Sequence, residues 1–188
     1  MLKEGEKGRK WAIANNLRNE YARGRVSALS TVRKWMLWYT MTVTASPVQF
    51  GVWIMALWFT SNGPAAYLTC ASLTSDPITA CTTHVAGAIS VTVSLCHTLC
   101  HFISGLIGLA AFFRRSWAIA YAILGAIFYL AWGFLGVVGG EHIRHHLGVD
   151  VFGTWVHVVE GSILFGIWLG DRLSVRSDSR SESSISSA

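Results

Sequence analysis

The chain has 188 residues, of which 52% are hydrophobic and 13% charged, and its mean hydropathy is +0.44. Because ordinary soluble domains carry about 25% charged residues, this composition excludes a typical soluble domain and indicates one integral membrane domain with polar ends. The net charge of +5 comes from basic residues near those ends, which is typical of cytoplasmic tails on a membrane protein and does not indicate nucleic-acid binding.

Residues 1–45 form a basic N-terminal segment with nine Lys or Arg against three Glu. Apolar residues at helical spacing (Ile13, Leu17 and Tyr21) favour a basic helix on a surface of anionic lipids. Interruptions of that pattern leave a solvated, partly disordered tail as an alternative. A third interpretation is an over-extended reading frame, with the natural start at Met41.

The first of four predicted spans covers residues 48–68, and Pro47 suits the first turn of a helix there. The pair Gly63–Pro64 is expected to end or kink this helix. A polar loop follows, and it contains Cys70 and Cys81.

The second predicted span, residues 86–113, contains no Lys, Arg, Asp or Glu. It is long enough to cross a hydrocarbon core of roughly 30 Å as a helix. His97 and His101 lie four residues apart, so one face of that helix presents both imidazoles. The same face holds Gly105 and Gly108, which let another backbone approach closely. We therefore expect the two histidines to point at a neighbouring helix.

Residues 117–138 and 151–170 are the third and fourth predicted spans. The loop between them carries His142, His145 and His146. These three residues are interpreted either as a metal-binding or pH-sensing cluster or as an ordinary hydrated loop. The Ser-rich tail, residues 172–188, is expected to be disordered.

Basic residues alternate between the loops and so predict an orientation. They lie before the first span, between the second and third, and after the fourth, whereas the other two loops contain only Arg144. By the positive-inside rule, both termini then face the cytoplasm. The predicted fold class is an all-α membrane protein, a four-transmembrane-helix bundle with both termini cytoplasmic, in the plasma membrane.

The four cysteines divide by compartment under this orientation. Cys70 and Cys81 fall in an outward loop, where oxidising conditions permit a disulfide. Cys96 and Cys100 lie inside the second span, in a string one residue longer than a haem-attachment motif. Covalent haem attachment within a lipid-embedded helix is excluded, and the two are expected to be small packing residues.

Four groups of residues, spaced over all the spans, resemble one known family. In chain order they are Ser46–Gln49, the pair His97 and His101 followed by Gly105 and Gly108, the series Tyr121, Gly125, Tyr129 and Gly133, and Asp150 followed by Trp155–His157. Together they resemble the bacterial four-helix membrane proteins grouped as domain-of-unknown-function family 4383, over about residues 46–170. The resemblance implies a multi-pass protein of the bacterial inner membrane without an assigned activity.

The candidate site combines the second and fourth spans. Counted inward at about 1.5 Å per residue, His101 and His157 both lie roughly 20 Å from the cytoplasmic boundary. His97 is one turn further out, and Glu160 is one turn further in, next to His157 on its helix. Ionisable groups inside a bilayer normally turn inward to find partners. We therefore expect the two polar stripes to face each other.

Three interpretations of this cluster stay open. His97, His101, His157 and Glu160 could coordinate a transition metal, because imidazole suits Zn, Cu or Fe. Alternatively, His157 with His101 or His97 could supply the axial ligands of a b-type haem. In the third interpretation the four side chains satisfy one another as a hydrogen-bonded structural lock or proton relay.

No hydrolase, metalloprotease, phosphate-loop or dinucleotide motif is found in the sequence, so an enzyme is not expected. The leading hypothesis is an accessory or scaffold membrane protein with a structural polar core. The alternative is a metal- or haem-binding redox protein. The expected partners are the lipid bilayer and other membrane proteins or further copies of the chain.

Overall fold

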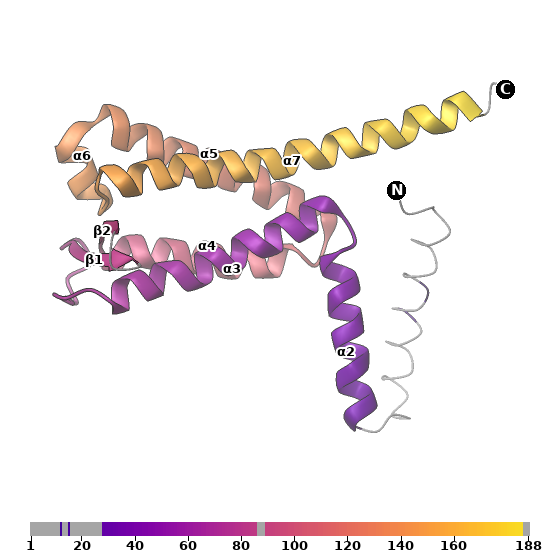
Figure 1. The fold of residues 1–188 in the computed structure, drawn as a ribbon, viewed down its shortest axis with the longest axis horizontal. Coiled ribbons are helices and arrows are strands. Elements are labelled where there is room, and N and C mark those ends of the chain that lie inside the picture. Colours follow the sequence, from indigo (N-terminus) through magenta and orange to yellow (C-terminus); the bar gives the residue numbers. More distant parts are fainter. Residues whose placement is uncertain (1–11, 13–14, 16–27, 86–88, 186–188) are drawn as a thin grey trace.

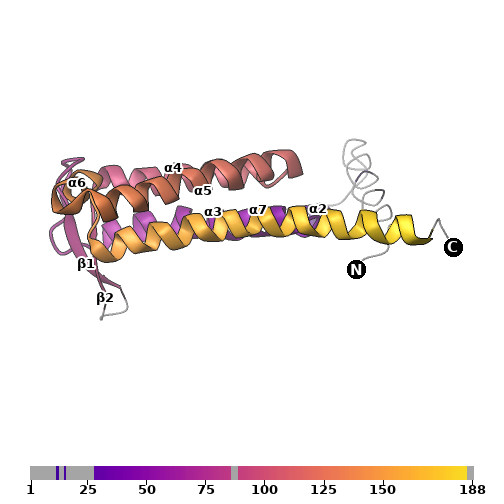
Figure 2. The ribbon, with the colours of Figure 1, turned by 90° about the horizontal axis from the view of Figure 1, so that it is seen from above.

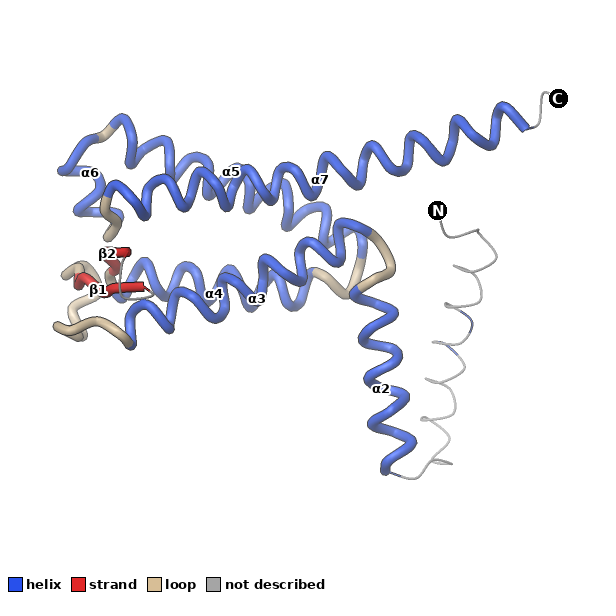
Figure 3. The backbone as a smooth tube through the Cα atoms, viewed as in Figure 1, coloured by secondary structure: helices blue, strands red, loops and turns tan. Residues whose placement is uncertain are grey.

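The computed structural model describes residues 12, 15, 28–85 and 89–185. Their helices and strands are, in chain order, α2 (Ala28–Val43), α3 (Pro47–Leu68), β1 (Cys81–Val85), β2 (Ile89–Val93), α4 (Leu95–Ala111), α5 (Arg115–Val138), α6 (Gly140–Leu147) and α7 (Val151–Ile185). The described chain is therefore mostly helical, with a single β-hairpin among the described segments, at one end of the molecule (Figure 3).

Four long helices, α3, α4, α5 and α7, run along one axis and alternate in direction (Figure 1). The most extensive packing joins α3 to α4 and α5 to α7. Seen from above, α4 lies beside α5 and α3 beside α7 (Figure 2). The helices therefore form two tight pairs, and a less extensive interface separates one pair from the other.

Small residues bring the backbones of each pair into contact. In the first pair, a Cβ added at Gly105 of α4 would lie 2.9 Å from the Ala56 carbonyl oxygen of α3. In the second pair, a Cβ at Gly161 of α7 would lie 2.8 Å from the backbone nitrogen of Leu130 in α5. This close approach is the usual means of helix association in lipid, where apolar side chains gain nothing by leaving one hydrocarbon phase for another.

Two helices are long and apolar enough to span a membrane, α5 and the Val151–Val175 part of α7. A third span results if Thr31–Val43 and Pro47–Leu68, which meet at an angle of 108°, are counted together; α4 is shorter, with 17 residues. Large apolar side chains such as Leu124 and Ile127 point outward and are more than 60% exposed. A surface of this kind suits contact with lipid and indicates membrane localisation.

The prediction of one helix over residues 86–113 is wrong at its start. Ile89–Val93 forms a strand instead, and α4 begins at Leu95 with Ser94 as its N-cap. The apolar and hydroxyl side chains alternate from Ile89 to Val93, which is the period of a strand. The prediction used the absence of charge, the length of the stretch and the helical spacing of its histidines, and it missed this alternation; residues 86–88 lie outside the described part.

The first predicted span, residues 48–68, agrees with α3. Of the two outcomes expected at Gly63–Pro64, an end of the helix does not occur, because α3 continues to Leu68 and its last turn packs through Tyr67 on Val93 and Cys81 of the hairpin. The tail, expected to be disordered from residue 172, is helical to Ile185. Extending an existing helix needs no new nucleus, so a polar continuation costs little.

The N-terminal segment, residues 1–45, is described only in part. Its last portion forms α2, which runs nearly at right angles to α3 (Figure 1). Most of the remaining segment, including the apolar spacing of Ile13, Leu17 and Tyr21, lies outside the described residues.

A disulfide ties the end of α3 to the hairpin. Cys70 and Cys81 are bonded, with their Cα atoms 5.9 Å apart. Cys81 is buried against Tyr67 and Val93, so the link lies in a small apolar cluster. Cys96 and Cys100 are free thiols in α4.

The close contact between α3 and α4 yields a stability prediction. A methyl group at position 105 would meet the Thr60 backbone nitrogen at 2.5 Å, and backbone cannot move aside like a flexible side chain. Gly105→Ala is expected to lower the free energy of unfolding in detergent by about 1–3 kcal/mol. The control is Gly166→Ala, where nothing lies within 4 Å of the added methyl, and it is expected to be neutral or slightly stabilising. Equal loss in both variants would contradict the packing argument.

Candidate functional site

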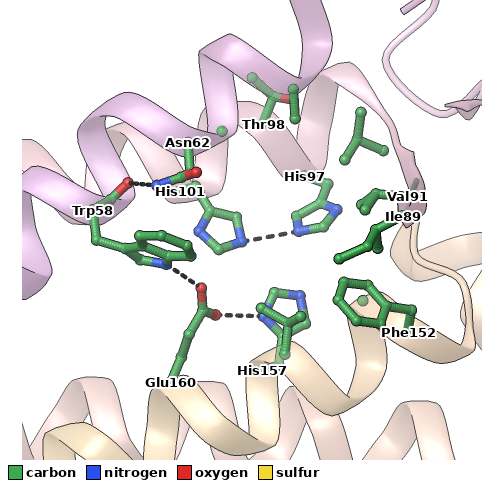
Figure 4. A pocket seen from close by; sticks show the side chains of 15 residues that line it. Trp58, Asn62, Ile89, Val91, His97, Thr98, His101, Phe152, His157 and Glu160 are labelled. Atoms are coloured by element: carbon green, nitrogen blue, oxygen red, sulfur yellow. Dashed lines mark hydrogen bonds and ion pairs between the residues drawn. The ribbon is translucent and has the colours of Figure 1, made fainter. Parts of the chain in front are cut away.

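The candidate site lies between the two helix pairs. His97 and His101 come from α4, whereas His157 and Glu160 come from α7 (Figure 4). All four side chains are buried, with at most 8% of each residue exposed. The structure thus brings together the four ionisable residues of the two polar stripes, whereas Gly105 and Gly108 on the same face of α4 pack on α3 and α5 rather than on α7.

Two capping residues fix where the site helices begin. The Ser94 hydroxyl accepts a hydrogen bond from the His97 backbone N–H at 3.2 Å and so caps α4. At the start of α7, one carboxylate oxygen of Asp150 accepts from Gly153 N–H at 2.7 Å. Its other oxygen accepts from Thr92 N–H in β2 at 2.8 Å. Asp150 therefore links the hairpin to the helix that carries His157.

The tautomer of His97 follows from its contacts. Nδ1 of His97 lies 2.9 Å from the Gly148 carbonyl oxygen and must donate, because a carbonyl can only accept. Gly148 ends α6 with a φ of +64°, a conformation that favours glycine and aims this carbonyl at the ring. The Nε2 atom of His97 then carries the lone pair. It accepts from Nε2 of His101 at 3.0 Å.

Glu160 serves as a partner for two donors. One carboxylate oxygen lies 2.9 Å from Nδ1 of His157. The other accepts from the indole Nε1 of Trp58, in α3, at 2.8 Å. This arrangement holds the His157 ring with its Nε2 directed toward His97 and His101 (Figure 4).

Several buried polar atoms of the described residues have no hydrogen-bond partner. They include Nε2 of His157, Nδ1 of His101 and the hydroxyl of Thr98. Leaving a buried donor or acceptor unpaired costs about 1–3 kcal/mol, so each of these atoms requires an explanation. The His157 nitrogen is the most informative, because the rest of its side chain is held in place.

The three histidines form a group that could hold a metal ion. Within the described part of the chain, only His97, His101 and His157 bring three potential ligand atoms together, all within 4.8 Å of one another. Nitrogen ligands lie about 2 Å from zinc, so two of them on one ion are at most about 4 Å apart. A shift of less than about 1 Å would thus bring all three to one ion.

Glu160 does not belong to this ligand group, and this differs from the predicted set of four ligands. It has instead the position of a carboxylate that orients a metal-binding histidine through the other ring nitrogen. The outer histidines, His142, His145 and His146, lie on α6, where the ring centroids of His142 and His146 are 4.7 Å apart. Among described residues they do not form a group of three ligands, and their metal- or pH-sensing role stays a prediction.

Sequence reasoning missed Trp58, Thr98 and Gly148. Trp58 lies within the first predicted span, where a buried carboxylate on a neighbouring helix needs donors, and an indole N–H is one that an apolar helix can supply. The role of Gly148 depends on a contact across 51 positions in the chain. No local pattern predicts such a contact.

A cavity of about 270 Å³ opens onto the cluster. The three histidines, Glu160 and the polar residues Asn62 and Thr98 line one part of it, and mainly apolar residues of α3, β2 and α7 line the rest. The site can therefore admit a small group next to the histidine side chains.

The contact between His157 and Glu160 can be tested by a double-mutant cycle. Each of His157→Leu and Glu160→Leu leaves a buried polar partner without its hydrogen bond. In the double variant only the indole N–H of Trp58 loses its partner. The double variant is therefore expected to lose less stability than the sum of the single losses, by about 0.5–3 kcal/mol. Unfolding in detergent provides the measurement. Glu160→Leu combined with Ser162→Ala, an exposed residue bonded to its own helix, is the additive control; additivity in both pairs would contradict a shared hydrogen bond.

Comparison with known proteins identifies a family but no reaction. The comparisons with curated proteins and with solved structures give no match. A family model described as Domain of unknown function (DUF4383) matches residues 49–169, more than half of the chain, and the match contains all four site residues. The protein therefore belongs to the DUF4383 family.

Proposed function

We propose that this protein is a multi-pass membrane protein that binds one transition-metal ion through His97, His101 and His157. The observation that carries the proposal is the unpaired Nε2 of His157, which is buried and faces the other two imidazoles. Glu160 holds the opposite nitrogen of the same ring, as carboxylates do behind metal-bound histidines.

A purely structural lock explains less of this geometry. Hydrogen bonds between Trp58, Glu160 and His157 do support the accessory or scaffold role as a second candidate. That lock, however, leaves Nε2 of His157 without a partner. A metal ion would provide that partner, because Nε2 of His157 can donate its free lone pair to the ion.

The arrangement of the rings favours a metal ion over haem. Axial ligands of one haem approach the iron from opposite faces of the porphyrin, which must lie between them. Here the rings of His101 and His157 are stacked, with centroids 5.2 Å apart and an angle of 23° between the planes. Imidazole suits zinc, copper, iron or nickel. Three such ligands leave a fourth position open, where an ion can polarise a bound group.

We further propose that α3, α4, α5 and the first part of α7 cross the plasma membrane, with both termini in the cytoplasm. Support comes from the basic residues at one end of the bundle. Arg115 pairs with the buried Asp171 at 2.5 Å, and Arg114 lies over the ring of Trp117. Arginine beside an interfacial tryptophan at the ends of spans is typical of a cytoplasmic boundary.

The metal site has a direct test. Protein purified in mild detergent and exposed to excess Zn²⁺ or Co²⁺ is expected to retain one ion per chain, measured by elemental analysis after desalting. His157→Leu removes a ligand and is expected to abolish retention while the helical circular dichroism persists. Glu160→Gln is expected to weaken binding by about 10–100-fold, since it alters only the support of the ligand.

The matched control for this test is His146→Leu, which removes an exposed imidazole on α6 and is expected to leave the ion in place. A folded wild-type protein that retains no zinc, cobalt or copper would contradict the proposal and favour the scaffold role. A Soret absorption band that shifts on reduction would favour haem instead.

The topology has its own test. A reporter fused after Asp150 is expected to behave as external, and one fused after Arg176 as internal, because basic residues occupy alternate loops. Accessibility of the two reporters in intact bacterial cells provides the measurement. The reverse result would overturn the orientation and the compartment assigned to the disulfide.

A further inference from the structure

A second cavity adjoins the one at the histidine cluster and shares four lining residues with it. The second cavity has a volume of about 580 Å³ and lies between α3 and α7. Both cavities are lined by Trp58, Phe152, Val156 and Glu160. Together they form a groove, here called the α3–α7 groove, which extends from the imidazoles to Ile163 of α7.

The α3–α7 groove is apolar and opens sideways. From Phe152 to Ile163 it covers 11 helical steps, or about 16 Å at 1.5 Å per residue. Apart from Glu160, every described residue that lines the second cavity is apolar or aromatic. Its rim residues Ile54, Trp155 and Val159 are about half exposed. This rim belongs to helices that we propose to cross the membrane, so hydrocarbon of the bilayer is what lies against it.

The inner end of the groove is polar and incomplete. Thr98 lines the first cavity and is only 5% exposed, and its buried hydroxyl has no hydrogen-bond partner. The open position of an ion held by His97, His101 and His157 would face the same space. Among the described residues, no Lys or Arg lines either cavity, so a head group must be held by the ion and by the polar side chains of Thr98 and Asn62 rather than by basic side chains.

We propose that the α3–α7 groove binds an amphiphile with a single hydrocarbon chain, taken from the bilayer. Its small, oxygen-bearing head group, of the carboxylate type, coordinates the metal ion and accepts a hydrogen bond from Thr98. Its chain lies between α3 and α7. This inference rests on the proposed metal site. A bulky phosphodiester head group fits less well, because the inner cavity is small and offers no cationic side chain.

The experiment uses cobalt-loaded full-length protein in bilayer nanodiscs, because cobalt reports ligand changes in its visible spectrum. Two probes carry the same head group: acetohydroxamate, with no chain, and dodecanohydroxamate, with a long one. The groove variant is Val159→Trp, which fills the space between α3 and α7. The matched control is Val138→Trp on α5, since Val138 and Val159 are 60% and 55% exposed but only Val159 lines the groove.

Both probes are expected to shift the cobalt spectrum of the wild-type protein. Val159→Trp should lower the affinity for the long-chain probe by about tenfold or more, because several methylene groups of the probe are no longer buried. It should leave the affinity for the short probe unchanged. Val138→Trp should change neither affinity. Partitioning of the long chain into lipid is the same for all variants, so it cancels in this comparison.

The outcomes separate this inference from the metal site. Retained cobalt with equal long-chain affinity in both tryptophan variants would overturn the groove and leave the metal site standing. Failure to retain cobalt would overturn both. Thr98→Val is expected to lower the affinity for both probes by the same factor of several-fold, since it removes a contact to the head group that they share.

Discussion

The structure depends on one constraint: three imidazoles and a carboxylate are buried between helices that have little else polar to offer. In an apolar medium no water is present to form hydrogen bonds with these groups, so each needs a partner from the protein. The partners come from separate elements, namely Trp58 in α3, the Gly148 carbonyl after α6 and Glu160 in α7. The cluster therefore fixes the alignment of the two helix pairs, whose direct packing on each other is the less extensive.

The hairpin end of the molecule supports the cluster at its outer side. Asp150 accepts hydrogen bonds both from β2 and from the first turn of α7. A Cβ added at Gly148 would collide with the Ser94 side chain, so the end of α6 lies directly on the cap of α4. The starts of both site helices thus belong to one connected unit, and the Cys70–Cys81 disulfide joins α3 to it. The depth of His97 relative to His157 follows from these contacts.

The sequence predicted the composition of the site but not its internal roles. Helical periodicity placed His97 with His101 and His157 with Glu160, and the cost of ionisable groups in lipid predicted that the two stripes would meet. The division into ligands and support depends on ring orientation, which is set by the Gly148 carbonyl and by Trp58. Likewise, the β-hairpin escaped prediction because absence of charge suits a buried strand as well as a membrane helix. Only the alternation from Ile89 to Val93 distinguishes them.

The hydrogen bonds of the cluster also determine what metal binding must change. The Gly148 carbonyl requires the proton of His97 on Nδ1, and Glu160 favours the proton of His157 on Nδ1, so both rings already present Nε2 as a lone pair. His101 differs, because its Nε2 donates to His97. To coordinate through Nε2, His101 must move its proton to Nδ1, which has no partner. At the proposed metal site, two ligands would thus be preorganised, and the third would exchange one hydrogen bond for a bond to the ion.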